Sequence, residues 1–114
     1  MSSNILPIDG VSKNVKRALL NATNTGNTAL VAAAGATTKI RVLAVVLSTT
    51  LANTVKFQSA TTDKTATFPL GATAGFVLPF NEYGWFETAV NEALNFNMSV
   101  ATATGVSILY CLVN

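Results

Sequence analysis

The sequence predicts an all-β protein, a jelly-roll-like antiparallel β-sandwich preceded by an N-terminal arm. From residue 28 onward, short apolar or alternating runs recur between clusters of Gly, Asn, Thr and Pro, which is the pattern of strands and turns. The turns return about every 8–12 residues, as they do in sandwiches and jelly rolls. No long amphipathic helical pattern separates the runs, and this argues against an α/β fold. The 114 residues suit one domain.

Residues 1–26 differ from the rest, and we interpret them as an arm. The segment 11–21 predicts one short helix, with Ser12 as its N-cap and Val15 and Leu19 on one side. The turn-rich stretch 23–28 follows it. The predicted organisation is therefore an arm over 1–26 and a β-sandwich domain over 27–114.

Eight strands are expected in the domain. Residues 54–58 alternate, with Val55 and Phe57 on one side, and residues 93–100 alternate in the same way. A period of two indicates one buried and one solvated face. The predicted strands cover residues 28–34, 39–49, 54–59, 66–70, 75–79, 84–88, 93–100 and 105–112.

Two segments, 40–47 and 106–113, are apolar on both faces for much of their length. The outer face of an antiparallel sheet normally meets water. Another subunit could cover the outer face of these strands, or the N-terminal arm could do so. Both interpretations stay open at this point.

The composition is poor in reactive and charged groups. The chain has no His, one Cys and five carboxylates, and only 11% of its residues are charged, against about 25% in ordinary domains. A folded monomer of this size should expose about 6,000 Å², and so few charges cover only a small part of it. We therefore expect partner chains to cover part of the surface, and we expect no enzyme, no metal and no cofactor. Cys111, in an apolar run, is expected to be a small buried residue.

The positive charge is concentrated in the arm, where Lys13, Lys16 and Arg17 lie within five residues. They form either a solvated arm or a tether that docks on an acidic partner. The formal net charge of +2 is too small to indicate nucleic-acid binding. No segment has the pattern of a signal peptide, and the longest apolar run, 42–47, is too short to span a bilayer.

The segment 75–88 is the most distinctive, because it combines Phe80, Tyr83, Trp85 and Phe86. Aromatic residues at this density pack in a core or an interface, and they can also stack on sugars or bases. The absence of interleaved Lys or Arg argues against nucleic acid. The carboxylates at 82, 87 and 92 could in principle form a glycosidase pair or a cation site, but their spacing supports neither. We expect them to keep a turn soluble.

A resemblance rests on several of these runs. They include Gly75-Phe76-Val77-Leu78-Pro79-Phe80 and Gly84-Trp85-Phe86-Glu87-Thr88, together with the runs at 27–33, 39–43, 55–59 and 92–95. In these runs, over about 27–113, the chain resembles small virion structural proteins of tailed bacteriophages. Residues 1–26 lie outside the resemblance.

Size and composition extend this resemblance to capsid cement, or decoration, proteins. It implies a non-enzymatic homotrimer that binds the phage major capsid protein on the outer capsid surface and stabilises the shell. Such a protein is made in the host cytoplasm and resides in the virion, with Lys13, Lys16 and Arg17 as candidate capsid contacts. The alternative is a tail-fibre or receptor-binding head domain whose aromatic turn contacts host glycan. Neither function involves nucleic acid or a membrane.

Overall fold

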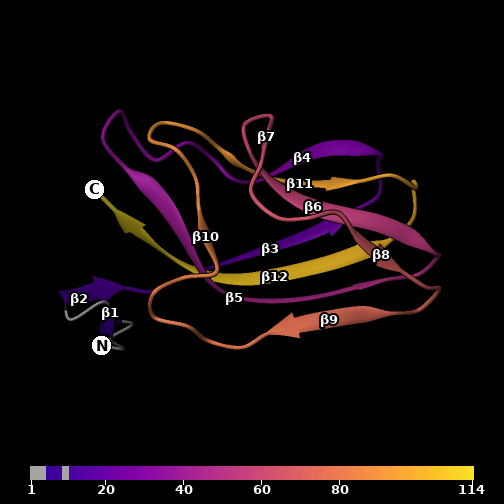
Figure 1. Cartoon of the computed structure of the whole chain (residues 1–114), viewed down its shortest axis with the longest axis horizontal. Coiled ribbons are helices and arrows are strands. Elements are labelled where there is room, and N and C mark those ends of the chain that lie inside the picture. Colours follow the sequence, from indigo (N-terminus) through magenta and orange to yellow (C-terminus); the bar gives the residue numbers. More distant parts are fainter. Residues whose placement is uncertain (1–4, 9–10) are drawn as a thin grey trace.

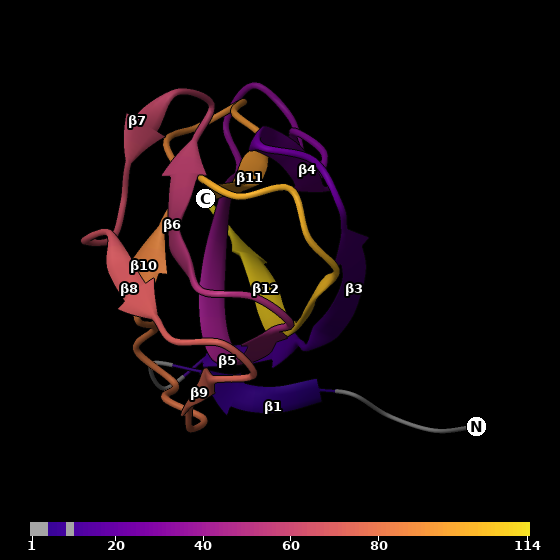
Figure 2. The same ribbon diagram turned by 90° about the vertical axis from the view of Figure 1, so that its right-hand side faces the viewer.

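The chain forms two packed antiparallel sheets and a separate N-terminal hairpin (Figure 1). A computed structural model describes residues 5–8 and 11–114, and the described part contains no helix. The hairpin pairs β1 (Ile5–Ile8) with β2 (Val11–Asn14). Figure 2 shows β1 on the lower side, beneath the end of β5.

Sheet 1 has the strand order β10-β5-β12-β3, and β9 also pairs with β5. Sheet 2 has the order β4-β11-β6-β7, and β8 also pairs with β6. The strands of sheet 1 are β3 (Lys16–Ala22), β5 (Lys39–Thr49), β9 (Gly75–Leu78), β10 (Phe86–Glu87) and β12 (Thr104–Val113). Those of sheet 2 are β4 (Gly26–Val31), β6 (Asn53–Ser59), β7 (Thr62–Asp63), β8 (Phe68–Leu70) and β11 (Leu94–Met98).

This arrangement confirms the predicted all-β, jelly-roll-like sandwich. If β9 and β10 are taken as one interrupted strand and the short β7 is set aside, eight strands divide equally between the two sheets, as in a jelly roll. Each of the eight predicted strands corresponds to an observed one, and the prediction for β5 has the observed bounds. The accessible surface is 5956 Å², in line with the expected value for a chain of this size.

The core lies between the sheets and follows the alternation of the strands. β6 and β11 contribute Val55, Phe57, Leu94, Phe96 and Met98, and all five are buried. Phe57 packs with its ring centroid 5.5 Å from that of Phe96, a distance typical of favourable aromatic pairs. β5 and β12 close the core from the opposite side with Ile40, Val42, Val45, Leu47, Val106 and Ile108.

The helix predicted over 11–21 is wrong, because this segment forms β2 and most of β3. The Lys, Arg, Ala and Leu residues of β3 favour a helix intrinsically, but pairing with a neighbouring strand overrides that weak preference. β3 pairs with β12 from Ala22↔Thr104 to Lys16↔Tyr110. Ala18 and Ala22 pack against the core, so the segment has a period of two rather than 3.6.

The predicted division at residues 26 and 27 therefore separates β3 from the sheet to which it is hydrogen-bonded. Residues 16–22 belong structurally to sheet 1, and within the described part of the arm only the segment before β3 lies outside the sandwich. Whether residues 27–114 fold independently stays a prediction.

The pairing of β5 with β12 contains one irregularity. Leu109 pairs with Ala44 and Tyr110 with Val42, so β5 has one extra residue, Leu43, which forms a β-bulge. Leu43 leaves the main core and joins a second buried cluster with Val15, Cys111 and Val113 on the outer side of sheet 1.

Two truncations test where the folded domain begins. Removing residues 1–14 leaves β3 and Val15 in place, so thermal unfolding followed by circular dichroism should remain cooperative. Removing residues 1–22 deletes an edge strand and uncovers part of the core, which should cost at least ~3 kcal/mol of unfolding free energy. Equal melting temperatures for the two truncations would show instead that the domain begins near residue 27.

Candidate functional site

Several ionisable side chains of the described residues are engaged in separate local contacts. Arg41 Nε donates to Glu87 Oε2 at 2.6 Å, and Ser59 Oγ donates to Glu92 Oε1 at 2.5 Å. The Ser59 hydroxyl also accepts the backbone N–H of Ala89 at 2.9 Å. Within residues 5–8 and 11–114, no group of three His, Cys, Asp or Glu side chains could hold a metal ion. Glu87 thus links β10 to β5, and Glu92 links the segment before β11 to the end of β6.

Two groups have displaced pKa values, each with a local cause. The hydrogen bond from Gln58, followed by the ammonium of Lys56 at 3.0 Å, lowers the pKa of Asp63. Burial raises the pKa of the Cys111 thiol. Cys111 therefore remains a protonated thiol within the second cluster, and this matches the buried position expected from the sequence.

The basic residues of the arm are distributed over two strands. Lys13 is half-buried in β2, whereas Lys16 and Arg17 are exposed at the start of β3. Adjacent residues of a strand point to opposite faces, so Lys16 and Arg17 diverge. Arg17 lies on the outer face of sheet 1, where it lines a groove.

The four aromatic residues named from the sequence divide into one partly buried side chain and three exposed ones. Phe86 packs against the core with its ring centroid 5.3 Å from that of Phe57. Phe80, Tyr83 and Trp85 are exposed. The segment connecting β9 to β10, residues 79–85, is called the aromatic loop below.

The aromatic loop is attached to the bulge of β5. Asn81 N–H donates to Leu43 C=O at 2.9 Å, and Trp85 N–H donates to Val42 C=O at 2.8 Å. The indole N–H of Trp85 donates to Pro79 C=O at 2.8 Å. Gly84 has φ +82°, and a Cβ there would meet Arg41 Cγ at 2.5 Å. Backbone bonds and close packing thus hold the exposed rings on a structured loop.

The outer face of sheet 1 is built from small and apolar residues in register. One row across the strands contains Asn21, Gly105, Ser48 and Gly75. The next row contains Leu19, Ser107, Val46 and Val77, of which Leu19 is 68%, Val46 49% and Val77 64% exposed. Leu109 then lies between Arg17 and Ala44.

Ser107, Val46 and Val77 of the second row, with Leu109 and its neighbours Arg17 and Ala44, line an apolar groove of about 370 Å³. Its walls come from β5, β9, β12 and the start of the aromatic loop, and Phe80 is 47% exposed at its rim. Among the described residues that line it, Arg17 is the one that is charged. The structure thus places one of the three basic residues and one of the exposed aromatic residues on the same groove.

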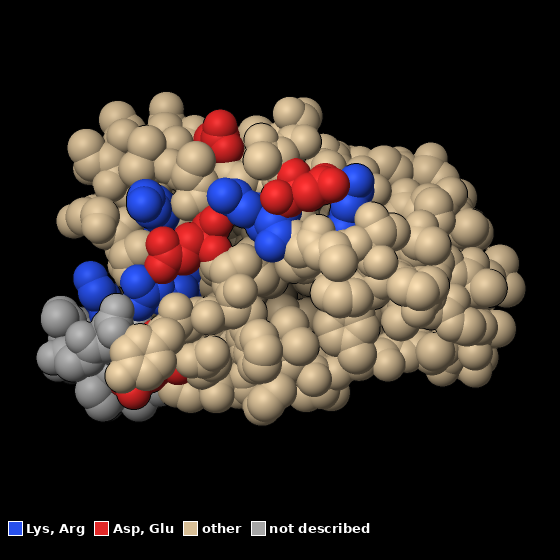
Figure 3. All heavy atoms as spheres, viewed as in Figure 1, with Lys and Arg blue, Asp and Glu red and all other residues tan. Residues whose placement is uncertain are grey.

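The outer face of sheet 2 is polar by contrast. Asn97 Nδ2 donates to Asn27 Oδ1 at 2.7 Å across β11 and β4, and Lys56 pairs with Asp63. Thr54 Oγ1 donates to Ser99 Oγ at 2.7 Å. Charged atoms gather in a band over the left and middle of the view in Figure 3, and the right-hand end has none. The two outer faces of the sandwich therefore differ in chemistry.

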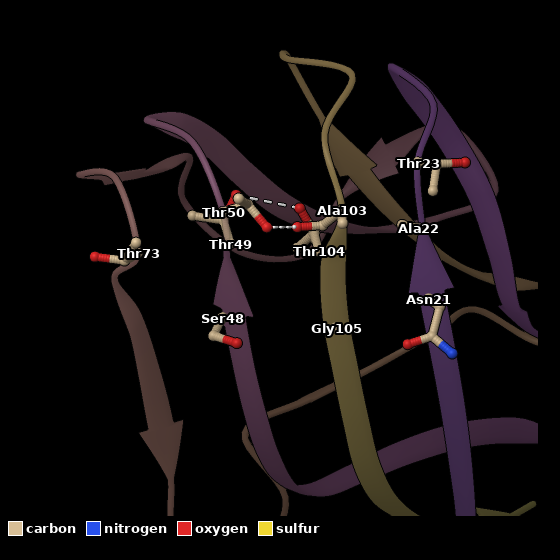
Figure 4. Close-up of a pocket in the computed structure, with 10 residues that line it drawn as sticks. All are labelled: Asn21, Ala22, Thr23, Ser48, Thr49, Thr50, Thr73, Ala103, Thr104 and Gly105. Atoms are coloured by element: carbon tan, nitrogen blue, oxygen red, sulfur yellow. Dashed lines mark hydrogen bonds between the residues drawn. The ribbon is translucent and has the colours of Figure 1, made fainter.

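A second hollow, of about 400 Å³, lies at one end of sheet 1 (Figure 4). Most of its hydroxyl groups bond within the protein: Thr49 and Thr104 hydroxyls lie 3.2 Å apart, and Thr50 Oγ1 donates to Ala103 C=O at 2.8 Å. Gly105 leaves the space above it open. The lining holds no ionisable side chain, so this hollow offers hydrogen bonds without acid–base chemistry.

No family model and no curated protein sequence matches this chain. Among solved structures, it is similar to a chain of the disulfide-linked pili that form Bacillus endospore appendages, with a TM-score of 0.48 and 13% identity over 98% of this chain and 89% of that one. It is also similar to CapF, a capsular polysaccharide assembling protein of Staphylococcus aureus, with a TM-score of 0.33 and 10% identity over 96% of this chain and 30% of that one. These likenesses are too low to support an inference about function.

The sequence left open what covers the outer faces of segments 40–47 and 106–113. In the structure, the N-terminal segment covers one end of these strands and leaves another part exposed. Val15 packs on Leu43, Cys111 and Val113 at one end. Further along, Val46 remains half exposed.

The described chain contains no helix long and apolar enough to cross a membrane. Sequence reasoning missed Leu19 and Val77 because their exposure follows from strand pairing, which no local pattern shows.

Substituting the adjacent residues Trp85 and Phe86 separately by Ala should destabilise the fold to different extents. Phe86→Ala should lower the unfolding free energy by ~3 kcal/mol or more, because it leaves a cavity beside Phe57. Trp85→Ala should lower the unfolding free energy by about 1 kcal/mol, because it removes the hydrogen bond to the Pro79 carbonyl. Urea unfolding measures both, and equal losses would contradict the assigned orientations.

Cys111 should react with a thiol reagent at pH 8 at least ~100-fold more slowly in the native protein than in urea, because a buried thiol is reached only by local opening. Val15→Ala should accelerate labelling by loosening the second cluster. Native labelling as fast as in urea would show that the N-terminal segment does not cover Cys111.

Proposed function

We propose that this chain is a non-enzymatic structural protein of a tailed-bacteriophage virion. In this proposal it is a capsid cement protein that binds the major capsid protein on the outer capsid surface as a homotrimer. The observation that carries the proposal is the unequal chemistry of the two outer faces. The face of sheet 2 carries Asn, Lys and Asp side chains that suit water, whereas the face of sheet 1 exposes Leu19, Val46 and Val77.

An exposed apolar face of this kind marks an interaction surface on a protein that acts by binding. The sequence resemblance to small phage virion proteins supports the virion as the setting. The separate local contacts of Glu87 and Glu92, and a hollow lined only by neutral side chains, offer no arrangement for acid–base catalysis. These observations favour a binding module over a hydrolase.

The mechanism is preferential binding to the assembled shell. A protein that binds the assembled state and not the dissociated subunits stabilises assembly in proportion to its occupancy. Weak contacts from three linked copies reinforce one another because attachment of the first raises the effective concentration of the others. Lys16 and Arg17, exposed on β3, supply charge for such contacts, with Lys13 nearby on β2.

A receptor-binding head domain is the second candidate, and the aromatic loop favours it. Phe80, Tyr83 and Trp85 expose their rings on a loop that backbone hydrogen bonds hold in place. Exposed aromatic rings on a preorganised loop suit stacking against sugars. In this case the protein would be present in a few copies at the tail, and glycans would compete for the loop.

Reversing the charges of Lys13 and Lys16 to Glu tests the cement function, and Arg17 is left in place because it also lines the groove of sheet 1. Exposed ion pairs are each worth ~0–1 kcal/mol and weaken with salt, so their sum over three copies should decide attachment. The variant should leave particles at moderate salt while retaining its fold. A matched control reverses Lys39 and Lys64, and it leaves the Lys56–Asp63 ion pair intact.

Quantitative mass spectrometry of purified particles supplies the second measurement. Cement function predicts many copies per particle, distributed over the capsid lattice. A few copies at the tail, together with release by free glycan, would support the receptor-binding alternative. Absence from the particle would contradict both functions.

A further inference from the structure

We infer that the outer face of sheet 1 is the surface through which copies of this chain contact one another. The inference rests on the proposed homotrimer and names the surface that forms it. The occupant of the apolar groove is a second copy of the chain.

The first argument is the chemistry of the face. Its central rows contain no charged residue, and Arg17 lies at the β3 edge. Interfaces between separately folded partners are about as polar as ordinary surface, whereas homomeric interfaces are more apolar. Permanent contacts between copies resemble a core divided in two. A face whose central rows are uncharged and expose Leu19, Val46 and Val77 fits the permanent, homomeric class.

The second argument is area. Six large apolar side chains are exposed on the rows and on the aromatic loop, and with ~150–250 Å² per aromatic side chain the exposed parts of all six amount to roughly 600 Å². A standard interface buries about 800 Å² per partner. Since this sum already includes the aromatic loop, the two partners together reach only the lower end of the standard range, ~1,200 Å² in total, and the contact must also cover the small exposed residues of the rows. The six side chains are those of Leu19, Val46, Val77, Phe80, Tyr83 and Trp85.

The third argument is shape. The small residues Ala44 and Ser107 are part of the lining of the groove of about 370 Å³, which has Arg17 of β3 and Phe80 of the aromatic loop in its walls. Sheets pack about 10 Å apart when both faces are smooth and apolar. A ring of three copies uses a heterologous contact. In such a ring the β3 edge of one copy, with its exposed Leu19, meets the groove beside Phe80 of the next copy.

The experiment is a charge substitution on the face with a matched control on the other sheet. Val46→Lys places an ammonium in the centre of the contact, and Val77→Lys repeats the test on another strand. The control is Ala29→Lys, which introduces the same charge at an exposed position of β4. Light scattering after size exclusion gives the mass of each, and circular dichroism verifies that each is folded.

The wild type and Ala29→Lys should have the mass of three chains at micromolar concentration. Val46→Lys and Val77→Lys should be folded and should dissociate at concentrations at least ~100-fold higher than the wild type, because an unpaired buried charge is costly. Folded trimers of both face variants, or a wild-type monomer, would overturn the inference.

Particle binding separates this inference from the proposed function. If the face variants stay trimeric but lose particle binding, the face contacts the capsid protein, and the inference fails while the cement function stands. If the wild type is a monomer that still binds particles, the inference also fails while binding to the capsid stands. Loss of the trimer with no wild-type binding to particles supports the inference and removes the proposed function.

Discussion

The pairing of β5 with β12 is the constraint on which the other features of the molecule depend. The two strands run antiparallel from Lys39↔Val113 to Thr49↔Thr104, with one extra residue in β5 at Leu43. On the inner side they supply half of the core. On the outer side the bulge directs both Leu43 and Ala44 away from the core, so the apolar character of these strands appears on two faces.

The same bulge organises the neighbouring edge. β9 pairs with β5 at residues 45–48, and β10 pairs with it at residues 41–42, so the edge partner changes at the bulge. The carbonyl groups of Val42 and Leu43 are then available to bind the aromatic loop. A one-residue insertion in one strand thus determines where Phe80 and Trp85 are presented and where the groove of sheet 1 ends. The proposed contact between copies depends on this local geometry.

Much of the fold could be predicted from the sequence because its strands are regular. The run that forms β5 is bounded by turns and apolar on both faces, and its predicted bounds agree with those observed. β3 could not be predicted, because its Ala, Leu and Lys residues favour a helix and only pairing with β12 makes the segment a strand. The small β7 has no apolar pattern of its own.

The candidate surface could be predicted only in part from the sequence, because strand pairing determines which of its side chains are exposed. Strands that are apolar on both faces indicated that another part of a protein covers them. The sequence pattern does not predict that Val15 covers Leu43 while Val46 stays exposed. The bulge that separates these regions depends on register, which sequence periodicity does not specify. The basic residues likewise lie close together in the sequence. In the structure, Lys16 and Arg17 are adjacent residues of β3, so their side chains point to opposite faces of the sheet.

Hydroxyl-radical footprinting of the native protein tests the central claim most directly, because it reports solvent contact for individual side chains. In a single chain, Val46 and Val77 are 49% and 64% exposed, comparable to Leu51 at 52% and Val90 at 43%. If copies of the chain cover the face of sheet 1, Val46 and Val77 should be oxidised several-fold more slowly than Leu51 and Val90. If all four residues are oxidised at equal rates, after correction for the intrinsic reactivity of Val and Leu, the face is not covered and the claim is contradicted.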